Sequence, residues 1–235
     1  MVISMKKTLI VTLAALTLLV AGCDASVNDD IKVADDAEHH GSEMTINGDV
    51  SVGRNADASS SDFKTVNGNI RVDDGAKVSD CATVNGKLVF GDNTETGDLK
   101  TVNGNLRLGR DARVNGHIQL VNGSIELSKG SVVSRDVQTV NGKIEMWGTE
   151  VGGDLTNVNG GMLVTDGSTV KGDLIVREAS DDPHSKPPRI VIGPDSRILG
   201  ELIFERPVKL YIHDSAETGP ISGADAELFS GDEPI

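Results

Sequence analysis

The stretch Thr83-Val84-Asn85-Gly86-Lys87-Leu88 decides the fold, because close copies of it recur along the chain at an almost constant spacing. The asparagines of these copies are Asn47, Asn67, Asn85, Asn103, Asn122, Asn141 and Asn159. Consecutive copies therefore lie 18 to 20 residues apart. A period of this length is typical of a solenoid, in which each repeat forms one coil and buries its apolar side against its neighbours.

Apolar residues recur at fixed positions on both sides of the motif. The column before it contains Phe63, Cys81, Leu99, Ile118, Val137, Leu155 and Leu174. The column after it contains Ile70, Leu88, Leu106, Ile125, Ile144 and Met162. Alternating apolar residues interrupted by Gly, Asn and Asp indicate short strands. The sequence therefore predicts an all-β, single-stranded parallel β-solenoid with 18–20-residue coils, roughly eight of them stacked ~4.8 Å apart.

The repeated Asn-Gly pair indicates a corner of each coil. Glycine adopts positive φ without steric cost, which predicts a tight turn at this position. Asparagines stacked from coil to coil are expected to form a ladder of side-chain hydrogen bonds. A metal or glycan site along the asparagine column is the functional alternative, and the structural ladder is favoured.

One segment leaves the path of the chain open. In Leu99-Lys100-Thr101-Val102, strict alternation puts Leu99 and Thr101 on one face and Val102 on the other. Both Leu99 and Val102 have the character of core residues. We expect a bend near Thr101 that turns Val102 inward; the alternative is an outward valine column, which would form an interaction surface.

The beginning of the sequence has the pattern of an export signal. Lys6 and Lys7 precede an uncharged apolar run over residues 9–20, which is too short to span a membrane. Residues 1–22 are therefore predicted to be a signal peptide.

The end of this segment, Val20-Ala21-Gly22-Cys23, resembles the lipobox of bacterial lipoproteins. The resemblance implies that Cys23 becomes a lipidated N-terminus and attaches the exported protein to a membrane. Asp24 follows directly and resembles the signal that retains lipoproteins of enteric bacteria in the inner membrane. The expected location is the bacterial envelope, at the periplasmic face of the inner membrane in preference to the outer membrane.

Composition divides the rest of the chain. Residues 23–43 are polar and acidic and are predicted to be a tether, with one weak strand at residues 31–33. The solenoid is expected over residues 44–213, interrupted by a polar, proline-rich loop at 178–188. Residues 214–235 are predicted to be an acidic cap and tail.

The formal net charge of −14 excludes nucleic acid as a partner, because there is no basic surface to neutralise phosphates. The chain has 27 Gly but only four Phe, one Trp and one Tyr, which fits a thin aliphatic core.

Candidate sites for chemistry are few. An acidic column precedes the first core position and contains Asp62, Asp80, Asp98, Asp136, Asp154 and Asp173. Asp98, Asp136 and Asp154 are the candidate ligands for a weak Ca²⁺ site, since that ion prefers oxygen ligands. Turn chemistry at a corner is the favoured interpretation of the same column. Cys81 is predicted to be a small core residue, and no cofactor is expected.

The motifs resemble two groups of bacterial proteins. The Thr-Val-Asn-Gly-x-Ile/Leu unit resembles the repeat of adhesin-like proteins. The units Val170-Lys171-Gly172-Asp173-Leu174 and Ile198-Leu199-Gly200-Glu201-Leu202 resemble bactofilins, which form cytoskeletal polymers. The resemblance covers about residues 45–213 and implies a β-solenoid; together with the period it favours a right-handed one. Bactofilins are mostly cytoplasmic, whereas this chain carries the pattern of an export signal.

The preferred hypothesis is a non-catalytic structural or adhesive scaffold, anchored to the membrane by lipid. Its partner would be an envelope protein, the cell wall or a second copy. A self-polymerising, bactofilin-like filament is the first alternative. The second is a solenoid-type carbohydrate-active enzyme, which would need a convergence of carboxylates, His or Arg that the sequence does not indicate.

Overall fold

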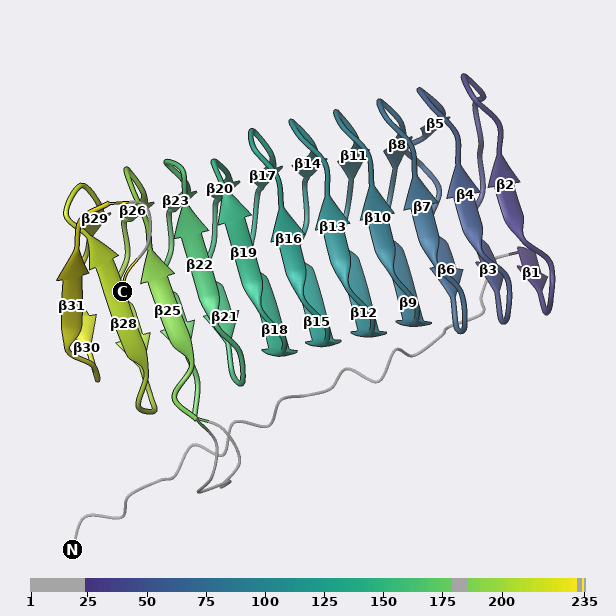
Figure 1. Cartoon of the computed structure of the whole chain (residues 1–235). Helices are drawn as coiled ribbons and strands as arrows, with labels where there is room; N and C mark the ends of the chain where they lie inside the picture. The colour runs from purple at the N-terminus through teal and green to yellow at the C-terminus, as the bar shows by residue number, and fades with distance from the viewer. Residues whose placement is uncertain (1–23, 179–185, 232–233, 235) are drawn as a thin grey trace, which may run out of the picture.

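The computed structural model describes residues 24–178, 186–231 and 234. The predicted signal peptide, Cys23 and most of the predicted loop at 178–188 lie outside the described residues. All regular structure in the described part is β, with 31 strands in three parallel sheets (Figure 1). The sheets form a β-solenoid of about 10 turns with about 19 residues per coil, so the predicted fold class is confirmed.

The strands fall into three sheets, which we call sheets A, B and C. Sheet A contains β1 (Asp24–Ser26), β3 (Glu43–Thr45), β6 (Phe63–Thr65), β9 (Cys81–Asn85), β12 (Leu99–Asn103), β15 (Ile118–Asn122), β18 (Val137–Asn141), β21 (Leu155–Asn157), β24 (Leu174–Val176), β27 (Leu202–Phe204) and β30 (Ile221–Ser222). Sheet B contains β2 (Ile31–Val33), β4 (Val50–Val52), β7 (Ile70–Val72), β10 (Leu88–Phe90), β13 (Leu106–Leu108), β16 (Ile125–Leu127), β19 (Ile144–Trp147), β22 (Met162–Thr165), β25 (Arg189–Ile192), β28 (Lys209–His213) and β31 (Ala226–Phe229). Sheet C contains β5 (Asp57–Ala58), β8 (Lys77–Val78), β11 (Glu95–Thr96), β14 (Arg113–Val114), β17 (Val132–Val133), β20 (Glu150–Val151), β23 (Thr169–Val170), β26 (Arg197–Ile198) and β29 (Glu217–Thr218).

Equivalent residues of successive coils lie next to one another. Leu99 pairs with Cys81 on one side and with Ile118 on the other. Leu106 of sheet B pairs in the same way with Leu88 and Ile125. These side chains are fully buried. The core is therefore a continuous stack of mainly aliphatic residues, which explains why so few aromatic rings are needed.

The expected bend at Thr101 is wrong. Leu99 and Thr101 are both buried, while Val102 is half-buried on the outer side, so the alternation continues. The Thr101 hydroxyl donates a hydrogen bond to the Gly86 carbonyl oxygen at 3.3 Å. A threonine whose hydroxyl has such a partner can occupy an inward position, and the valine is left outside.

The role predicted for the Asn-Gly glycines is also wrong. None of these glycines has positive φ; that conformation occurs at another corner, for example at Asn55, Asn93 and Asp111. Glycine is required for close approach instead, since a Cβ on Gly104 would lie 1.7 Å from the carbonyl oxygen of Gly86.

Strands extend beyond the predicted solenoid at both ends. β1 and β2, in the segment predicted as a tether, pair in parallel with β3 and β4. β2 is the strand predicted at residues 31–33, whereas β1 was not expected. At the other end, β29, β30 and β31 continue sheets C, A and B into the segment predicted as a cap and tail. Polar composition misled both predictions, because a coil needs only a few apolar inward residues, such as Ile31 and Val33. The first described strand begins at Asp24, the residue after Cys23 in the sequence.

Candidate functional site

The outer side of sheet A, which we call the A face, carries three regular columns of side chains. The first is the asparagine ladder. In each consecutive pair from Asn47 to Asn159, the amide Nδ2 donates to Oδ1 of the preceding asparagine at 2.7 to 3.0 Å. Asn28 precedes Asn47 in the ladder, and Arg206 Nη1 donates to Asn159 Oδ1 at its far end. The ladder asparagines thus bond to one another along the rod.

The second column, which we call the valine stripe, is aliphatic. It comprises Val27, Ile46, Val66, Val84, Val102, Val121, Val140 and Val158. Val27 is 56% exposed and Ile46 38%, and the others are half-buried. Arg177 takes the next position and forms an ion pair with Glu205 at 2.9 Å. The stripe is therefore continuous over eight coils and ends at a charged pair.

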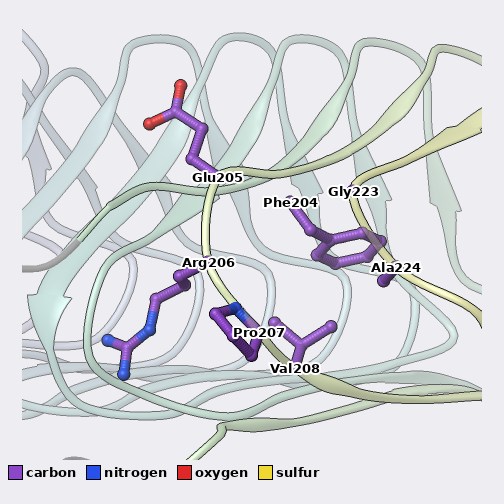
Figure 2. A pocket seen from close by; sticks show the side chains of 7 residues that line it. All are labelled: Phe204, Glu205, Arg206, Pro207, Val208, Gly223 and Ala224. Carbon is purple, nitrogen blue, oxygen red and sulfur yellow. The ribbon is translucent and has the colours of Figure 1, made fainter. Parts of the chain in front are cut away.

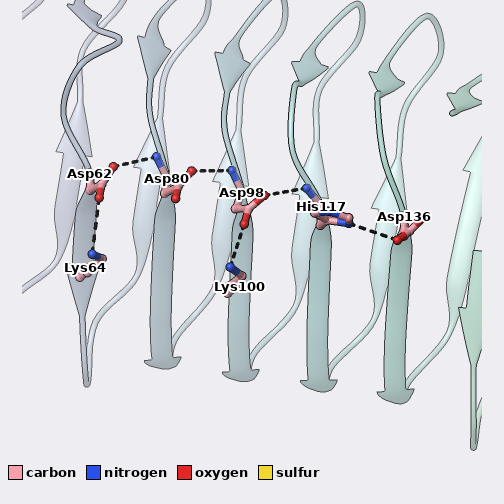
Figure 3. A network of polar contacts seen from close by, with 7 residues as sticks. All are labelled: Asp62, Lys64, Asp80, Asp98, Lys100, His117 and Asp136. Carbon is pink, nitrogen blue, oxygen red and sulfur yellow. Dashed lines mark hydrogen bonds and ion pairs between the residues drawn. The ribbon is translucent and has the colours of Figure 1, made fainter. Parts of the chain in front are cut away.

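The third column is acidic and is drawn in Figure 3. Oδ1 of Asp62 accepts from the amide of Asp80, and Oδ1 of Asp80 from that of Asp98. Oδ1 of Asp98 accepts from the amide of His117 at 2.8 Å. His117 itself lies 3.3 Å from Asp136 through Nδ1 and Oδ2. The column links each coil to the next.

The three predicted metal-ligand candidates belong to this column but do not converge. Asp136 and Asp154 each accept an amide hydrogen bond from the following coil at 2.9 Å, as Asp98 does. The described residues contain no group of three or more His, Cys, Asp or Glu that could hold a metal ion. The arrangement supports corner chemistry, which was the favoured interpretation.

Lysines lie close to the acidic column. Lys100 Nζ is 2.8 Å from Asp98 Oδ2, and Lys64 Nζ is 3.5 Å from Asp62 Oδ2. Partial burial acts to raise the pKa of Asp98, but hydrogen bonds from Lys100 and the His117 amide, with the nearby positive charges, lower it below its ordinary value. Asp98 is therefore held ionised as a hydrogen-bond acceptor, unlike a general acid, which needs a raised pKa.

Cys81 lies in the core, between Phe63 and Leu99 in sheet A. Its side chain is fully buried. Burial raises the pKa of the thiol, and the carboxylates of Asp80 and Asp62 raise it further. This environment disfavours the thiolate, which is the reactive form of cysteine.

The last coil of the solenoid is open. Leu228 and Ile221 pair with the buried Ile212 and Leu202, yet they are 72% and 38% exposed. A hollow of about 420 Å³ lies beside this coil, and Figure 2 shows Phe204, Pro207 and Val208 in its wall. The end of the rod therefore presents apolar side chains at core positions.

Several of these features were missed from the sequence. The inward threonine column was visible as a recurring threonine two residues before each ladder asparagine, for example Thr65, Thr83 and Thr101. Its role was hidden because each hydroxyl bonds to a carbonyl in the preceding coil. The open last coil gave no signal, since its sequence lacks the motif.

No protein-family model matches the chain, and no curated protein or solved structure matches it. Within the described residues, no helix has the length and apolar character needed to cross a membrane.

Proposed function

We propose that the protein is a non-catalytic structural scaffold, held in the bacterial envelope by a lipid on Cys23, with the A face as its interaction surface. The observation that carries this proposal is the valine stripe. Eight aliphatic side chains in one line, at the strand spacing of ~4.8 Å, extend over about 34 Å. Two of the eight are exposed and six are half-buried, so the stripe is a contiguous apolar strip that reaches the surface. Large contiguous apolar patches are uncommon on soluble monomers and mark sites of interaction.

The columns beside the stripe suit the same role. The ladder asparagines already hydrogen-bond to one another. A partner that covers them would therefore bury few side-chain amides without a hydrogen-bond partner. The A face is also regular in its asparagine and valine columns, because equivalent residues of successive coils pair in register. A partner with a flat surface, such as an envelope protein or the cell wall, fits this array.

The acidic column gives less support to the carbohydrate-active enzyme considered from the sequence. Such an enzyme needs two carboxyl groups that converge on one bond. Asp98 and Asp136 belong to coils separated by the coil of His117, and Oδ1 of each accepts a backbone amide. These carboxylates hold the fold together, which favours the scaffold.

Photo-crosslinking in cells tests the A face. A photoreactive amino acid at Val102 is expected to trap the partner, because this side chain lies in the middle of the stripe. The same amino acid at Glu126, which points outward from sheet B, is the matched control and should give few adducts. Equal adducts from both positions, or none from Val102, would contradict the proposal.

Self-association through the open last coil is a second candidate function, in line with the resemblance to bactofilins. Leu228 and Ile221 are exposed at core positions, and β29, β30 and β31 are the last strands of their sheets. Unpaired strand edges pair readily with another chain. This route would use the end of the rod and leave the A face free.

Sedimentation velocity tests the second candidate. The purified protein should form species that grow with concentration, and Leu228→Asp should shift them toward monomer by placing a charge in the apolar contact. Arg113→Asp, on the outer side of sheet C, is the control and should leave association unchanged. A wild-type protein that stays monomeric at high concentration would remove this candidate.

A further inference from the structure

The outer side of sheet B changes character along the rod. One column of outward positions contains Arg107, Glu126 and Glu145 in the middle coils. The same column continues as Leu163, Val191 and Tyr211. This column therefore turns from charged to apolar at β22 and stays so through β28, while Arg189 and Lys209 remain exposed at the start of β25 and β28.

A hollow of about 430 Å³ lies at this apolar end of sheet B. Trp147, Leu163 and Val191 contribute apolar walls, and the charged lining consists of Lys143, Glu145, Asp166 and Arg189. Pro234 also lines the hollow, although it is 45 residues further along the chain than Arg189. Val191 is only 8% exposed despite its outward position, in keeping with a covered surface.

Arg189 connects the hollow to Pro234. Its Nη2 donates a hydrogen bond to the Pro234 carbonyl oxygen at 2.9 Å. The same guanidinium lies over the ring of Tyr211, 5.1 Å from the ring centroid. Stacking on an aromatic ring holds the planar guanidinium in a fixed orientation, so the donor is positioned before the carbonyl arrives.

We propose that this hollow is a peptide-binding groove, and that its occupant is the segment of this same chain that carries Pro234. The aliphatic and aromatic wall takes the proline ring, and Arg189 binds the proline carbonyl. Proline suits such a site because its fixed φ reduces the entropy lost on binding. The ligand class is an extended, proline-containing peptide. The contact holds Pro234 against sheet B, after the last strand of that sheet, and so retains the last coil.

Trp147 reports directly on this groove, because it is the only tryptophan of the chain and lines the hollow. In the purified protein, Arg189→Gln and Pro234→Gly are each expected to shift the Trp147 emission to longer wavelength. Each should also raise its quenching by acrylamide about twofold. Arg107→Gln, an exposed arginine on the same face of sheet B, is the matched control and should change neither quantity.

A synthetic peptide of residues 230–235 completes the test. It should reverse the emission shift of a chain truncated after Ser230, and Arg189→Gln should weaken its binding at least tenfold. Far-UV circular dichroism checks that each variant is folded. If the truncated chain fails to fold, Pro234→Gly in the full chain decides. The proposal is overturned if Pro234→Gly leaves the emission and quenching of Trp147 unchanged, even where Arg189→Gln alters them.

Discussion

Replacing Gly104 with alanine is expected to lower the free energy of unfolding by about 3 kcal/mol. The added methyl group would lie 1.7 Å from the carbonyl oxygen of Gly86 in the preceding coil. The clash is with backbone, so no side-chain rotation relieves it. Gly104 also donates its amide to the Asn122 carbonyl oxygen at 3.0 Å, which ties it to the following coil. Any shift that relieves one contact therefore strains the other.

Urea unfolding followed by circular dichroism measures the effect of Gly104→Ala. Arg107→Ala is the matched control, since it lies three residues further on and points outward from sheet B. A surface substitution of this kind should change stability by no more than about 0.5 kcal/mol. Gly123→Ala should reproduce the large effect, because a Cβ there would lie 1.9 Å from Gly104 O. Equal unfolding midpoints for Gly104→Ala and Arg107→Ala would contradict the prediction. They would mean that adjacent coils can move apart enough to accept the added methyl group.

The fold was predictable because the same constraint is repeated in each coil. A single Asn-Gly pair signals only a turn, but seven pairs at a near-constant spacing require stacked coils. The ladder followed from the same argument. Once Asn85 and Asn103 occupy equivalent places in adjacent coils, their amides are within hydrogen-bonding distance, as the 2.8 Å contact shows.

The outward valines were the alternative and the bend was preferred, because the deciding contact is distant in sequence. Thr101 is inward since its hydroxyl reaches Gly86, a residue of the preceding coil. Residue type alone favours burying Val102 over Thr101, and local alternation favours the reverse. The reason for glycine at position 104 could not be predicted for the same reason. Its close contact with the Gly86 carbonyl oxygen exists only once the two coils are stacked.

The first coil shows why the ends were misread. Ser26-Val27-Asn28-Asp29-Asp30-Ile31 is an imperfect copy of the motif, with Ser in place of Thr and Asp in place of Gly. Glycine is needed where a coil stacks on a preceding one: a Cβ on Gly48 would lie 2.1 Å from Asp29 O. Asp29 is in the first coil of the described part, and no described coil precedes it. The first described coil therefore does not need the glycine by which the motif is recognised.

Replacing Cys23 with serine is expected to move the protein from the membrane fraction to the soluble fraction, if the lipid at this residue is the anchor. Acyl chains supply the binding free energy. The net charge of −14 offers no attraction to anionic lipids in their absence. Fractionation of cells that carry each form measures the effect, and Cys81→Ser is the control because Cys81 is buried. A Cys23→Ser protein that still sediments with membranes would contradict lipid anchoring.

Anchoring through a lipid on Cys23, as proposed, should also give the protein a defined orientation, because the first described strand begins at Asp24, the next residue in the sequence. Lys32 and Glu227 lie in the same outward column of sheet B, in the first and last of its 11 strands. At ~4.8 Å per strand they are about 48 Å apart. A donor dye attached through Lys32→Cys should therefore transfer energy efficiently to an acceptor in the lipid, and one attached through Glu227→Cys should do so weakly. Equal transfer from the two positions would mean that the rod lies flat on the membrane and would contradict the defined orientation.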